Sequence, residues 1–484
     1  MYKELLPMNH PTRINRRRFL QMMTAGMTGT ALLSACQPGA APSAAPDAAP
    51  AANSGAAAAA PRSEWVTGNI PADLSATFKY TGWEGEAEMR KWLLHFDNFF
   101  KENYPNVDVQ GDWGVPWGDY WTKMPTQLAA GAEIDLMWMH DSRAKTFAAN
   151  GWIIALDDFL ASFTPPGWPA EFYPSQVSAF AYNGKQYGIP YDFASGGLYC
   201  NLDLFEAAGI ELPNENTTWD EFLEIAKKLT IKEGDTTKQW GVVGLPTNWS
   251  GGAYSVVKTF GGDYWNADIT QSMFDNEKTI AAFQYLADLI WEHGVMPTND
   301  MLAGMGFTGD SGVLAFGAGA AAMAYSLNDG AFVFQEAVEG KFKWGFAPTP
   351  RGENQFYFTG GSAFSIPTSA TQPELAYELM RYTLTNPATL PISGKMGSQF
   401  TGNMNFYEFG LPLDDWGVDK EAFKQVFYTL PRDHGIAPAY HPKYLEWETS
   451  IFQTYMDPLW VGEERNAAAA CAKVHEATNA LLEG

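Results

Sequence analysis

Aromatic and acidic side chains lie at or just after the ends of three expected strands in the first half of the chain. They are Trp83, Glu84, Trp117, Trp138, His140 and Asp141. An indole ring contributes dispersion and C–H/π contact to a flat ligand face, or attracts a quaternary ammonium group. A carboxylate accepts two hydroxyl protons and so orients a ligand. Together these residue types predict non-covalent binding of a small molecule rich in hydroxyl groups or carrying a positive charge.

A second group of aromatic residues follows expected strands and glycine-rich turns later in the chain. Its members are Trp249, Trp265 and Tyr325. Ligands of α/β domains bind at the carboxyl ends of strands, where loops and helix N-termini present unpaired N–H groups. We therefore expect these residues to contribute to a ligand site as well.

Each candidate also has a purely structural explanation. Glu84 would serve as a negative charge at a helix N-terminus, Asp141 as a cap for a helix that begins near residue 142, and His140 as an ordinary surface residue. The chain has 18 Trp, and most aromatic side chains of a protein lie in its core. Both explanations stay open for each residue at this point.

The periodicity of apolar residues predicts the α/β elements that position the first group. Residues 76–80 alternate like a strand, and apolar residues at helical spacing over 86–104 predict a helix. A strand at 107–109, a helix at 120–130 and an apolar strand at 134–139 follow. The beginning of the folded part is therefore expected to be a βαβ arrangement.

Further amphipathic helices are expected along the rest of the chain. Residues 218–221 read TWDE, which is a capping box that precedes an apolar stripe. Four more helices are predicted at 277–293, 374–384, 444–455 and 464–482. The sequence shows no internal repeat of fixed period.

The first sixty residues predict export and attachment to a membrane. Residues 15–21 read NRRRFLQ and resemble a twin-arginine signal, although an ordinary Sec route also stays open. Residues 33–36 read LSAC and resemble a bacterial lipobox, which predicts that Cys36 is lipidated. An Ala- and Pro-rich stretch follows and is expected to form an extended tether.

Composition and size exclude several classes of function. The formal net charge is −24, and an acidic surface repels nucleic acid. A folded part of this size exceeds the usual limit of a single core, so two lobes are expected. Cys200 and Cys471 are expected to be buried free thiols, and no spacing of His and Cys suits a metal. Residues 304–309 match G-x-G-x-x-G only as a string, so we expect a cleft loop there and no nucleotide site.

Several segments, in order along the chain, resemble the family 1 extracellular solute-binding proteins of ABC importers. The strongest match is the long block over 182–210, which the capping box follows; within it, Cys200 and Leu202 replace the family's usual Tyr and Lys. The other matching segments are 99–109 (FFKENYPNVDV), 128–136 (LAAGAEIDL), 316–323 (FGAGAAAM) and 360–367 (GGSAFSIP). The resemblance covers about residues 74 to 482, and it is specific because the segments are long and ordered.

This resemblance implies an α/β, two-lobe, periplasmic-binding-protein-like (type II) fold with hinge strands between the lobes. The implied organisation is an export signal (1–35), a lipidated Cys36 with its tether (36–73), an N-terminal lobe (74–190 with 358–398) and a C-terminal lobe (191–357 with 399–484). It also implies capture of a mono- or oligosaccharide by lobe closure and delivery to an ABC permease. No cofactor, metal or nucleic acid is expected, and the protein is expected to be a monomer outside the cytoplasm.

The resemblance also implies roles for single residues. Asp141 matches a position whose carboxylate accepts sugar hydroxyls, and Trp138 lies three residues before it, as in maltodextrin binders. Further ligand residues are expected beside the crossing strands and on a late helix, namely Asp192, Gly360, Gly361 and Trp447. Glycine lacks a Cβ, so the backbone at Gly360 and Gly361 can approach a ligand closely.

Two other functions remain compatible with the residues. Paired acids near aromatic rings are also the equipment of a glycoside hydrolase, so an anchored enzyme is the main alternative. An adhesion or scaffold lipoprotein is the third hypothesis, and it predicts no affinity for small molecules. Release of reducing ends from a polysaccharide would favour the enzyme, and saturable binding without turnover would favour transport.

Overall fold

The computed structural model describes residues 64–83, 86–247, 249–308, 311–386, 400–405 and 413–483. The predicted export signal, Cys36, the first part of the tether and Glu84 lie outside these residues. Within this part of the chain, no helix has the length and apolar character needed to cross a membrane.

The first lobe is built around a five-stranded sheet with the order β2-β1-β3-β13-β6. Its strands are β1 (Thr77–Thr81), β2 (Asp108–Asp112), β3 (Leu136–His140), β6 (Ile189–Pro190) and β13 (Ser362–Ser365). β1 pairs in parallel with β2 and β3, as expected for helix-connected strands, whereas β13 pairs antiparallel with β3 and β6. The first lobe therefore contains both early residues and the segment that returns after residue 361.

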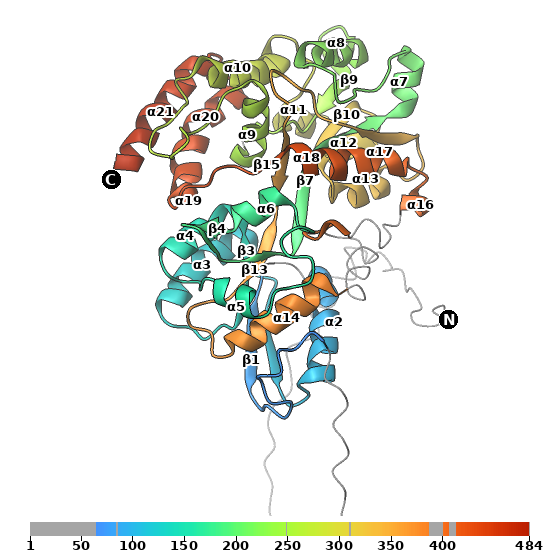
Figure 1. Cartoon of the computed structure of the whole chain (residues 1–484). Coiled ribbons are helices and arrows are strands. Elements are labelled where there is room, and N and C mark those ends of the chain that lie inside the picture. Colours follow the sequence, from blue (N-terminus) through green and yellow to red (C-terminus); the bar gives the residue numbers. More distant parts are fainter. Residues whose placement is uncertain are drawn as a thin grey trace, which may run out of the picture. The chain divides into compact units, whose positions relative to one another are not determined.

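Helices surround this sheet, and most of them bury apolar side chains against the lobe. They are α2 (Glu86–Asn103), α3 (Trp117–Ala129), α4 (Asp141–Ala149), α5 (Asp157–Ser162), α6 (Pro174–Ala179) and α14 (Pro373–Thr385). The helices α2 and α14 lie side by side (Figure 1), and Phe96 and Leu379 of these helices belong to one core. Between α6 and β6 in the sequence, β4 (Ala181–Tyr182) and β5 (Lys185–Gln186) form a small hairpin.

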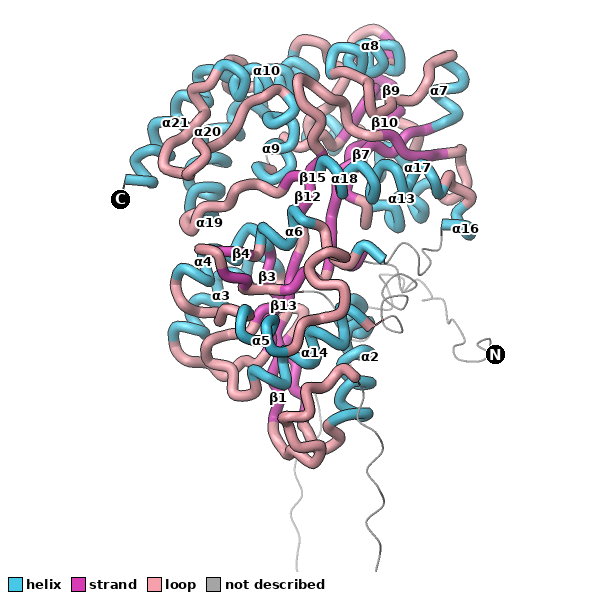
Figure 2. Tube along the Cα trace, in the orientation of Figure 1, coloured by secondary structure: helices cyan, strands magenta, loops and turns pink. Residues whose placement is uncertain are grey.

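The second lobe is built around a larger sheet whose central strands have the order β12-β7-β10-β9-β8. Its strands are β7 (Asp192–Asn201), β8 (Ile231–Glu233), β9 (Thr236–Val243), β10 (Ala321–Leu327), β11 (Trp344–Ala347), β12 (Tyr357–Gly360), β14 (Phe400–Thr401) and β15 (Gly435–Ile436). The long strand β7 pairs antiparallel with β10, β11, β12 and β14. Figure 2 shows the strands of each lobe running between surrounding helices and loops.

Helices surround the sheet of the second lobe. The earlier ones are α7 (Leu202–Ala208), α8 (Trp219–Leu229), α9 (Ser250–Thr259), α10 (Glu277–Trp291), α11 (Asn299–Gly304), α12 (Ser311–Gly317) and α13 (Gly330–Val338). The later ones are α16 (Leu413–Trp416), α17 (Lys420–Lys424), α18 (Leu430–His434), α19 (Tyr444–Trp447), α20 (Gln453–Val461) and α21 (Ala467–Glu483), with π-helical turns at Gln425–Thr429 and Glu448–Phe452. The helices α10, α20 and α21 pack on one another (Figure 1).

Two of the crossings between the two sheets consist of a single residue each. Tyr191 separates β6 of the first sheet from β7 of the second, and Gly361 separates β12 of the second sheet from β13 of the first. Gly361 has φ +156°, a conformation that favours glycine. The predicted two-lobe α/β fold is therefore the observed fold, with the two sheets joined by these crossings.

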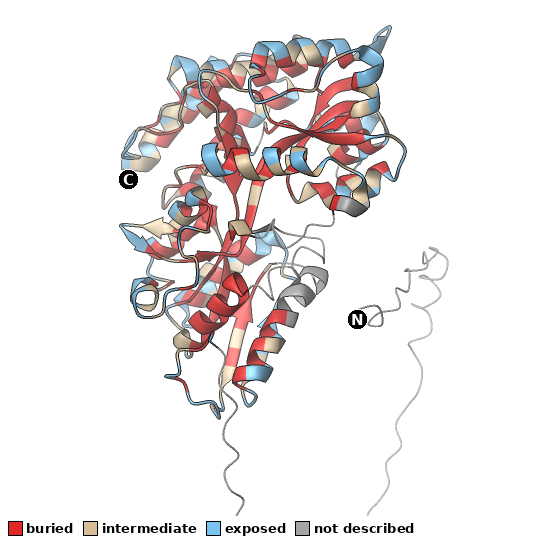
Figure 3. Ribbon diagram, turned by 45° about the vertical axis from the view of Figure 1, so that its right-hand side comes forward, coloured by how far each residue is buried: buried red, intermediate tan, exposed pale blue. Residues whose placement is uncertain are grey.

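Each lobe has its own apolar core (Figure 3). The central strands are buried, whereas the edge strands β2 and β8 are largely exposed, and so are the outer faces of the helices. Cys200 and Cys471 are both buried and unpaired, as predicted. Burial raises the pKa of the Cys200 thiol, so this thiol stays protonated and behaves as a small apolar side chain.

Candidate functional site

An aromatic cluster lies at the carboxyl ends of the first strands of the first lobe. The Trp83 ring lies 5.1 Å from the ring of Trp117 and 5.6 Å from that of Trp138. Trp117 also contacts the His140 ring at 5.0 Å, and its side chain is 42% exposed. The structure therefore brings four of the first predicted candidates together, and Trp117 presents a large apolar face to solvent.

Trp117 has this position because α3 begins earlier than the predicted range 120–130. Pro116 occupies the N-cap position and Trp117 is the first helical residue. Proline suits the start of a helix, since the first N–H groups have no intrahelical partner. Pro116 was therefore a signal for the helix start in the sequence. The prediction used only the apolar stripe and so placed the start too late.

His140 and Asp141 lie at the start of α4, directly after β3. The His140 side chain, and not that of Asp141, caps this helix by accepting a hydrogen bond from the Ser142 amide. The Asp141 side chain is fully buried, and its Oδ1 lies 3.0 Å from Nδ1 of His140. Burial and the neighbouring Asp141 carboxylate raise the pKa of Tyr440, so the phenol beside Asp141 remains protonated.

Residues of α4 also contact the C-terminal part of the second lobe. Arg143 Nη2 lies 3.4 Å from Oε2 of Glu448, and both side chains are largely buried. The other oxygen of Glu448 accepts a hydrogen bond from the Ser250 hydroxyl at the start of α9. The Thr146 hydroxyl donates to the carbonyl of Pro442. Asp141 therefore lies beside a polar junction between the two lobes.

The candidates at the crossing strands make contacts within the protein. The Asp192 carboxylate accepts a hydrogen bond from the Ser362 amide, which ties the two crossings together. A Cβ on Gly361 would lie 2.8 Å from both the carbonyl oxygen and Oδ1 of Asp192. A Cβ on Gly360 would lie 2.6 Å from the Phe358 ring and 3.4 Å from Oδ2 of Asp141. Both glycines thus allow close packing of the protein on itself, and we assign Asp192 to the same hinge packing.

Three of the predicted aromatic candidates lie in the cores. Trp138 packs against Tyr191 and Phe364 and is 1% exposed. Trp265 and Trp447 contact each other at 4.8 Å and belong to the core of the second lobe. Their burial offers no face to a ligand in this conformation, so we assign all three to packing.

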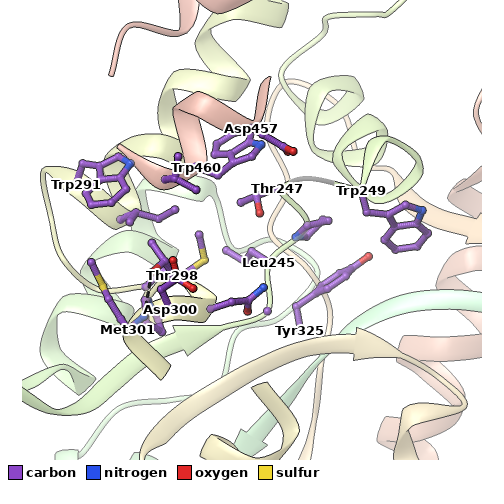
Figure 4. A pocket seen from close by; sticks show the side chains of 17 residues that line it. Leu245, Thr247, Trp249, Trp291, Thr298, Asp300, Met301, Tyr325, Asp457 and Trp460 are labelled. Carbon is purple, nitrogen blue, oxygen red and sulfur yellow. Dashed lines mark hydrogen bonds between the residues drawn. The ribbon is translucent and has the colours of Figure 1, made fainter. Parts of the chain in front are cut away.

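The remaining two candidates, Trp249 and Tyr325, line a pocket of about 600 Å³ in the second lobe. Trp249 precedes α9 and its side chain is 37% exposed, whereas Tyr325 lies in β10 and is nearly buried. Figure 4 shows these two residues on one side of the pocket and Trp291 and Trp460 on the other. Its volume lies within the range of small-molecule sites, about 300–1,000 Å³.

Apart from Trp249 and Tyr325, the residues that line the pocket were not predicted from the sequence, and three of them are Trp291, Asp457 and Trp460. Trp291 ends α10, and Asp457 and Trp460 belong to α20. Trp291 lies four residues after Ala287 of the apolar stripe in the predicted helix 277–293 and packs against the core of the second lobe, so its position in the sequence gave no signal of a pocket. Asp457 and Trp460 are separated from Trp249 by about two hundred residues of sequence, so only the tertiary packing, in which α10 contacts both α9 and α20, brings them together.

Among the residues that the structure describes, no group of His, Cys, Asp and Glu has the arrangement of a metal site. The start of the 304–309 string, Gly304, is the last residue of α11. A dinucleotide-binding motif follows a strand and opens a helix. Here the string instead begins at the end of a helix.

Comparison with known proteins agrees with this architecture. A curated lactose-binding protein of Rhizobium radiobacter is 28% identical over 182 residues, which are 37% of this chain and 40% of that protein. An arabinooligosaccharide-binding protein of Bacillus subtilis is 23% identical over 323 residues, 63% of this chain and 70% of that protein. The chain thus matches less than half the length of the first relative.

Solved structures share the fold. An ABC substrate-binding protein of Listeria monocytogenes, in complex with cycloalternan, superposes with a TM-score of 0.71 at 20% identity. The superposition covers 84% of this chain and 99% of that one. The family model of the bacterial extracellular solute-binding proteins matches residues 82–389. The resemblance seen in the sequence is thereby confirmed, and the chain belongs to this family of extracellular solute-binding proteins.

Proposed function

We propose that this protein captures a mono- or oligosaccharide outside the cytoplasm and delivers it, chemically unchanged, to an ABC import permease. The observation that carries the proposal is the Trp83, Trp117 and His140 cluster beside the buried Asp141 carboxylate. An exposed indole next to hydrogen-bonding groups suits a sugar, which has apolar C–H faces and a rim of hydroxyls. The sugar ligands named for the two curated relatives support this class.

Binding is coupled to movement of the lobes in this proposal. A ligand that contacts both lobes shifts the equilibrium toward the closed form, because it binds that form better. The junction formed by Arg143, Glu448 and Pro442 supports closure, since these contacts join α4 to the second lobe. The permease then recognises the closed form, and the protein itself performs no covalent step.

The proposal includes attachment to the membrane through Cys36. Residues 33–36 read LSAC, and the Ala- and Pro-rich stretch that follows would hold the lobes away from the lipid. Acyl chains on one cysteine contribute roughly 0.8 kcal/mol per buried CH₂, so two or three chains anchor a folded domain without a membrane-spanning helix.

Replacement of Trp117 by alanine tests the sugar site. We expect Trp117→Ala to weaken binding of the tightest sugar in a carbohydrate panel at least tenfold, or about 1.4 kcal/mol. The exposed position of Trp117 predicts a loss of stability of no more than about 1 kcal/mol. Titration calorimetry and thermal unfolding measure the two effects.

The matched control is Trp416→Ala. The Trp416 ring packs on Phe332 in the second lobe, away from both the aromatic cluster and the pocket. Unchanged sugar affinity in Trp117→Ala would remove the proposed site. Recovery of the sugar in cleaved form, detected by chromatography after incubation, would replace the transport proposal with the hydrolase alternative.

A further inference from the structure

Two side chains with unused nitrogen donors lie where α4 of the first lobe contacts the segment before α19 of the second lobe. The Thr146 hydroxyl of α4 donates to the carbonyl of Pro442, and Figure 1 shows α4 and α19 at the boundary of the two lobes. Lys145 is the residue before this threonine, and His441 is the residue before this proline. The contact therefore brings Lys145 and His441 into the same part of the junction.

The ammonium group of Lys145 is available to a ligand. The residue is partly buried, and this burial lowers the pKa of Lys145. Within the part of the chain that the structure describes, its ammonium forms no hydrogen bond and no ion pair. It is also not one of the enclosed atoms without a partner, so a ligand from solvent can reach it. Desolvation without a partner disfavours the charge, and a bound anion would offset that cost.

The imidazole of His441 offers a second donor from the other lobe. Its Nδ1 accepts a hydrogen bond from the Lys443 amide at 3.0 Å. Burial and the positive charges of Lys443 and Lys145 lower the pKa of His441, so the ring is neutral near pH 7 and carries its proton on Nε2. This Nε2–H group has no partner among the described residues, and it is not enclosed.

The charges around these two donors favour an anion. The chain as a whole has a formal net charge of −24, but salt at physiological strength screens charges more than about 8 Å away. Among the described residues, no carboxylate contributes to the pKa shift of Lys145 or His441. Asp141, the acid of α4, is fully buried, and the ammonium of Lys443 adds a positive charge while it donates to the Leu481 carbonyl. The local charge is therefore positive.

We propose that Lys145 and His441 form a binding site for an oxyanion group, a carboxylate, phosphate or sulfate, between the two lobes. Such a group accepts hydrogen bonds through several oxygens, so it can take one donor from each lobe. The site exists only where α4 contacts the 441–443 segment, so a bound oxyanion favours that arrangement of the lobes.

The oxyanion belongs either to a free inorganic ion or to an acidic sugar. His140 of the aromatic cluster precedes α4 directly, and Lys145 lies little more than one helical turn further along this helix. An acidic sugar held at the cluster would therefore direct its carboxylate along α4. In this second case the inference rests on the proposed function and narrows its ligand, whereas a free ion would bind independently of sugar capture.

Conservative variants at the two donors test the site. Lys145→Gln removes the charge and keeps most of the stem, and Lys145→Arg keeps both charge and donors. His441→Asn removes the Nε2 donor and keeps a side-chain acceptor for the Lys443 amide. Titration calorimetry at constant ionic strength measures binding of inorganic phosphate, sulfate and glucuronate to the full-length protein and its variants, with glucose as the neutral match for glucuronate.

We expect Lys145→Gln to lower the affinity for the bound oxyanion at least tenfold and His441→Asn to lower it at least threefold. Lys145→Arg should stay within threefold of the wild type. The matched control is Lys101→Gln, because Lys101 lies on α2 in the first lobe, 3.9 Å from Asp97 of the same helix. It removes the same charge and should change the affinity less than twofold. Thermal unfolding confirms that each variant is folded.

The outcomes identify the source of the oxyanion or overturn the site. Binding of phosphate or sulfate that depends on Lys145 assigns the site to a free ion, and binding of glucuronate alone with the same dependence assigns it to an acidic sugar. Absence of saturable binding of all three oxyanions to the wild type overturns the site, as does equal affinity in Lys145→Gln. An equal loss of glucose binding in this variant also overturns it, because Lys145 would then serve sugars irrespective of charge.

Neutral sugars separate this inference from the proposed function. Binding of a neutral sugar by the wild type, with unchanged affinity in Lys145→Gln, upholds sugar capture whatever the oxyanion results are. Failure of the oxyanion experiment together with normal binding of a neutral sugar therefore removes only the oxyanion site.

Discussion

The crossing at Gly361 makes a quantitative prediction about the hinge. Alanine at this position would adopt a positive φ, which costs roughly 1–3 kcal/mol. Its Cβ would also lie 2.8 Å from Oδ1 of Asp192, so the carboxylate would have to leave the Ser362 amide. Loss of a hydrogen bond to a charged group costs about 1.5–3 kcal/mol. We expect Gly361→Ala to lower the free energy of unfolding by about 3–5 kcal/mol.

Urea unfolding followed by tryptophan fluorescence measures this loss. Gly319→Ala is the matched control, because Gly319 has φ +73° and a Cβ added to it would meet no atom within 4 Å. The free energy of unfolding of Gly319→Ala should fall only by the cost of placing alanine in a left-handed conformation, about 1–2 kcal/mol. A loss in Gly361→Ala no larger than that in Gly319→Ala would refute the argument that Asp192 and Gly361 are packed together at the hinge.

Two further predictions concern pH and membrane attachment. Burial lowers the pKa of His95 to about 4, so between about pH 6.5 and about pH 4 the unfolded chain binds a proton that the folded chain does not. Stability should therefore fall by up to about 3 kcal/mol as the pH drops through this window. In urea titrations at the two ends of this pH window, the free energy of unfolding should fall less in His95→Gln than in the wild type. An equal fall would contradict the assignment of this pH dependence to His95. Cys36→Ser should move the protein from the membrane pellet to the soluble fraction, and retention in the pellet would exclude lipidation at Cys36.

Local sequence patterns predicted the elements well where short-range interactions decide them. The capping box at Thr218 and Glu221 forms as expected, and α8 follows it. The predicted helix 277–293 corresponds to α10, and the predicted strand 76–80 to β1. Caps, stripes and alternation depend on residues a few positions apart, so they are legible in the sequence.

Predictions were less accurate where distant contacts shape an element. The predicted helix 444–455 is interrupted by the π-helical turn at Glu448–Phe452 and then continues to Val461. Glu448 in this turn contacts Ser250 and Arg143, which belong to other elements and to both lobes. Such contacts have no local signature, so a regular helix was the expected result.

The sequence by itself determined the family, the two-lobe α/β fold and the abundance of aromatic residues suited to a ligand. Only the tertiary structure decided which aromatic rings remain accessible. Trp117 and Trp249 are partly exposed, whereas Trp265 and Trp447 have the same residue type and comparable surroundings in sequence yet lie in the core. The physical reason is that burial depends on the packing of elements far apart in the chain, and this same packing joins α10, α20 and β10 around the pocket.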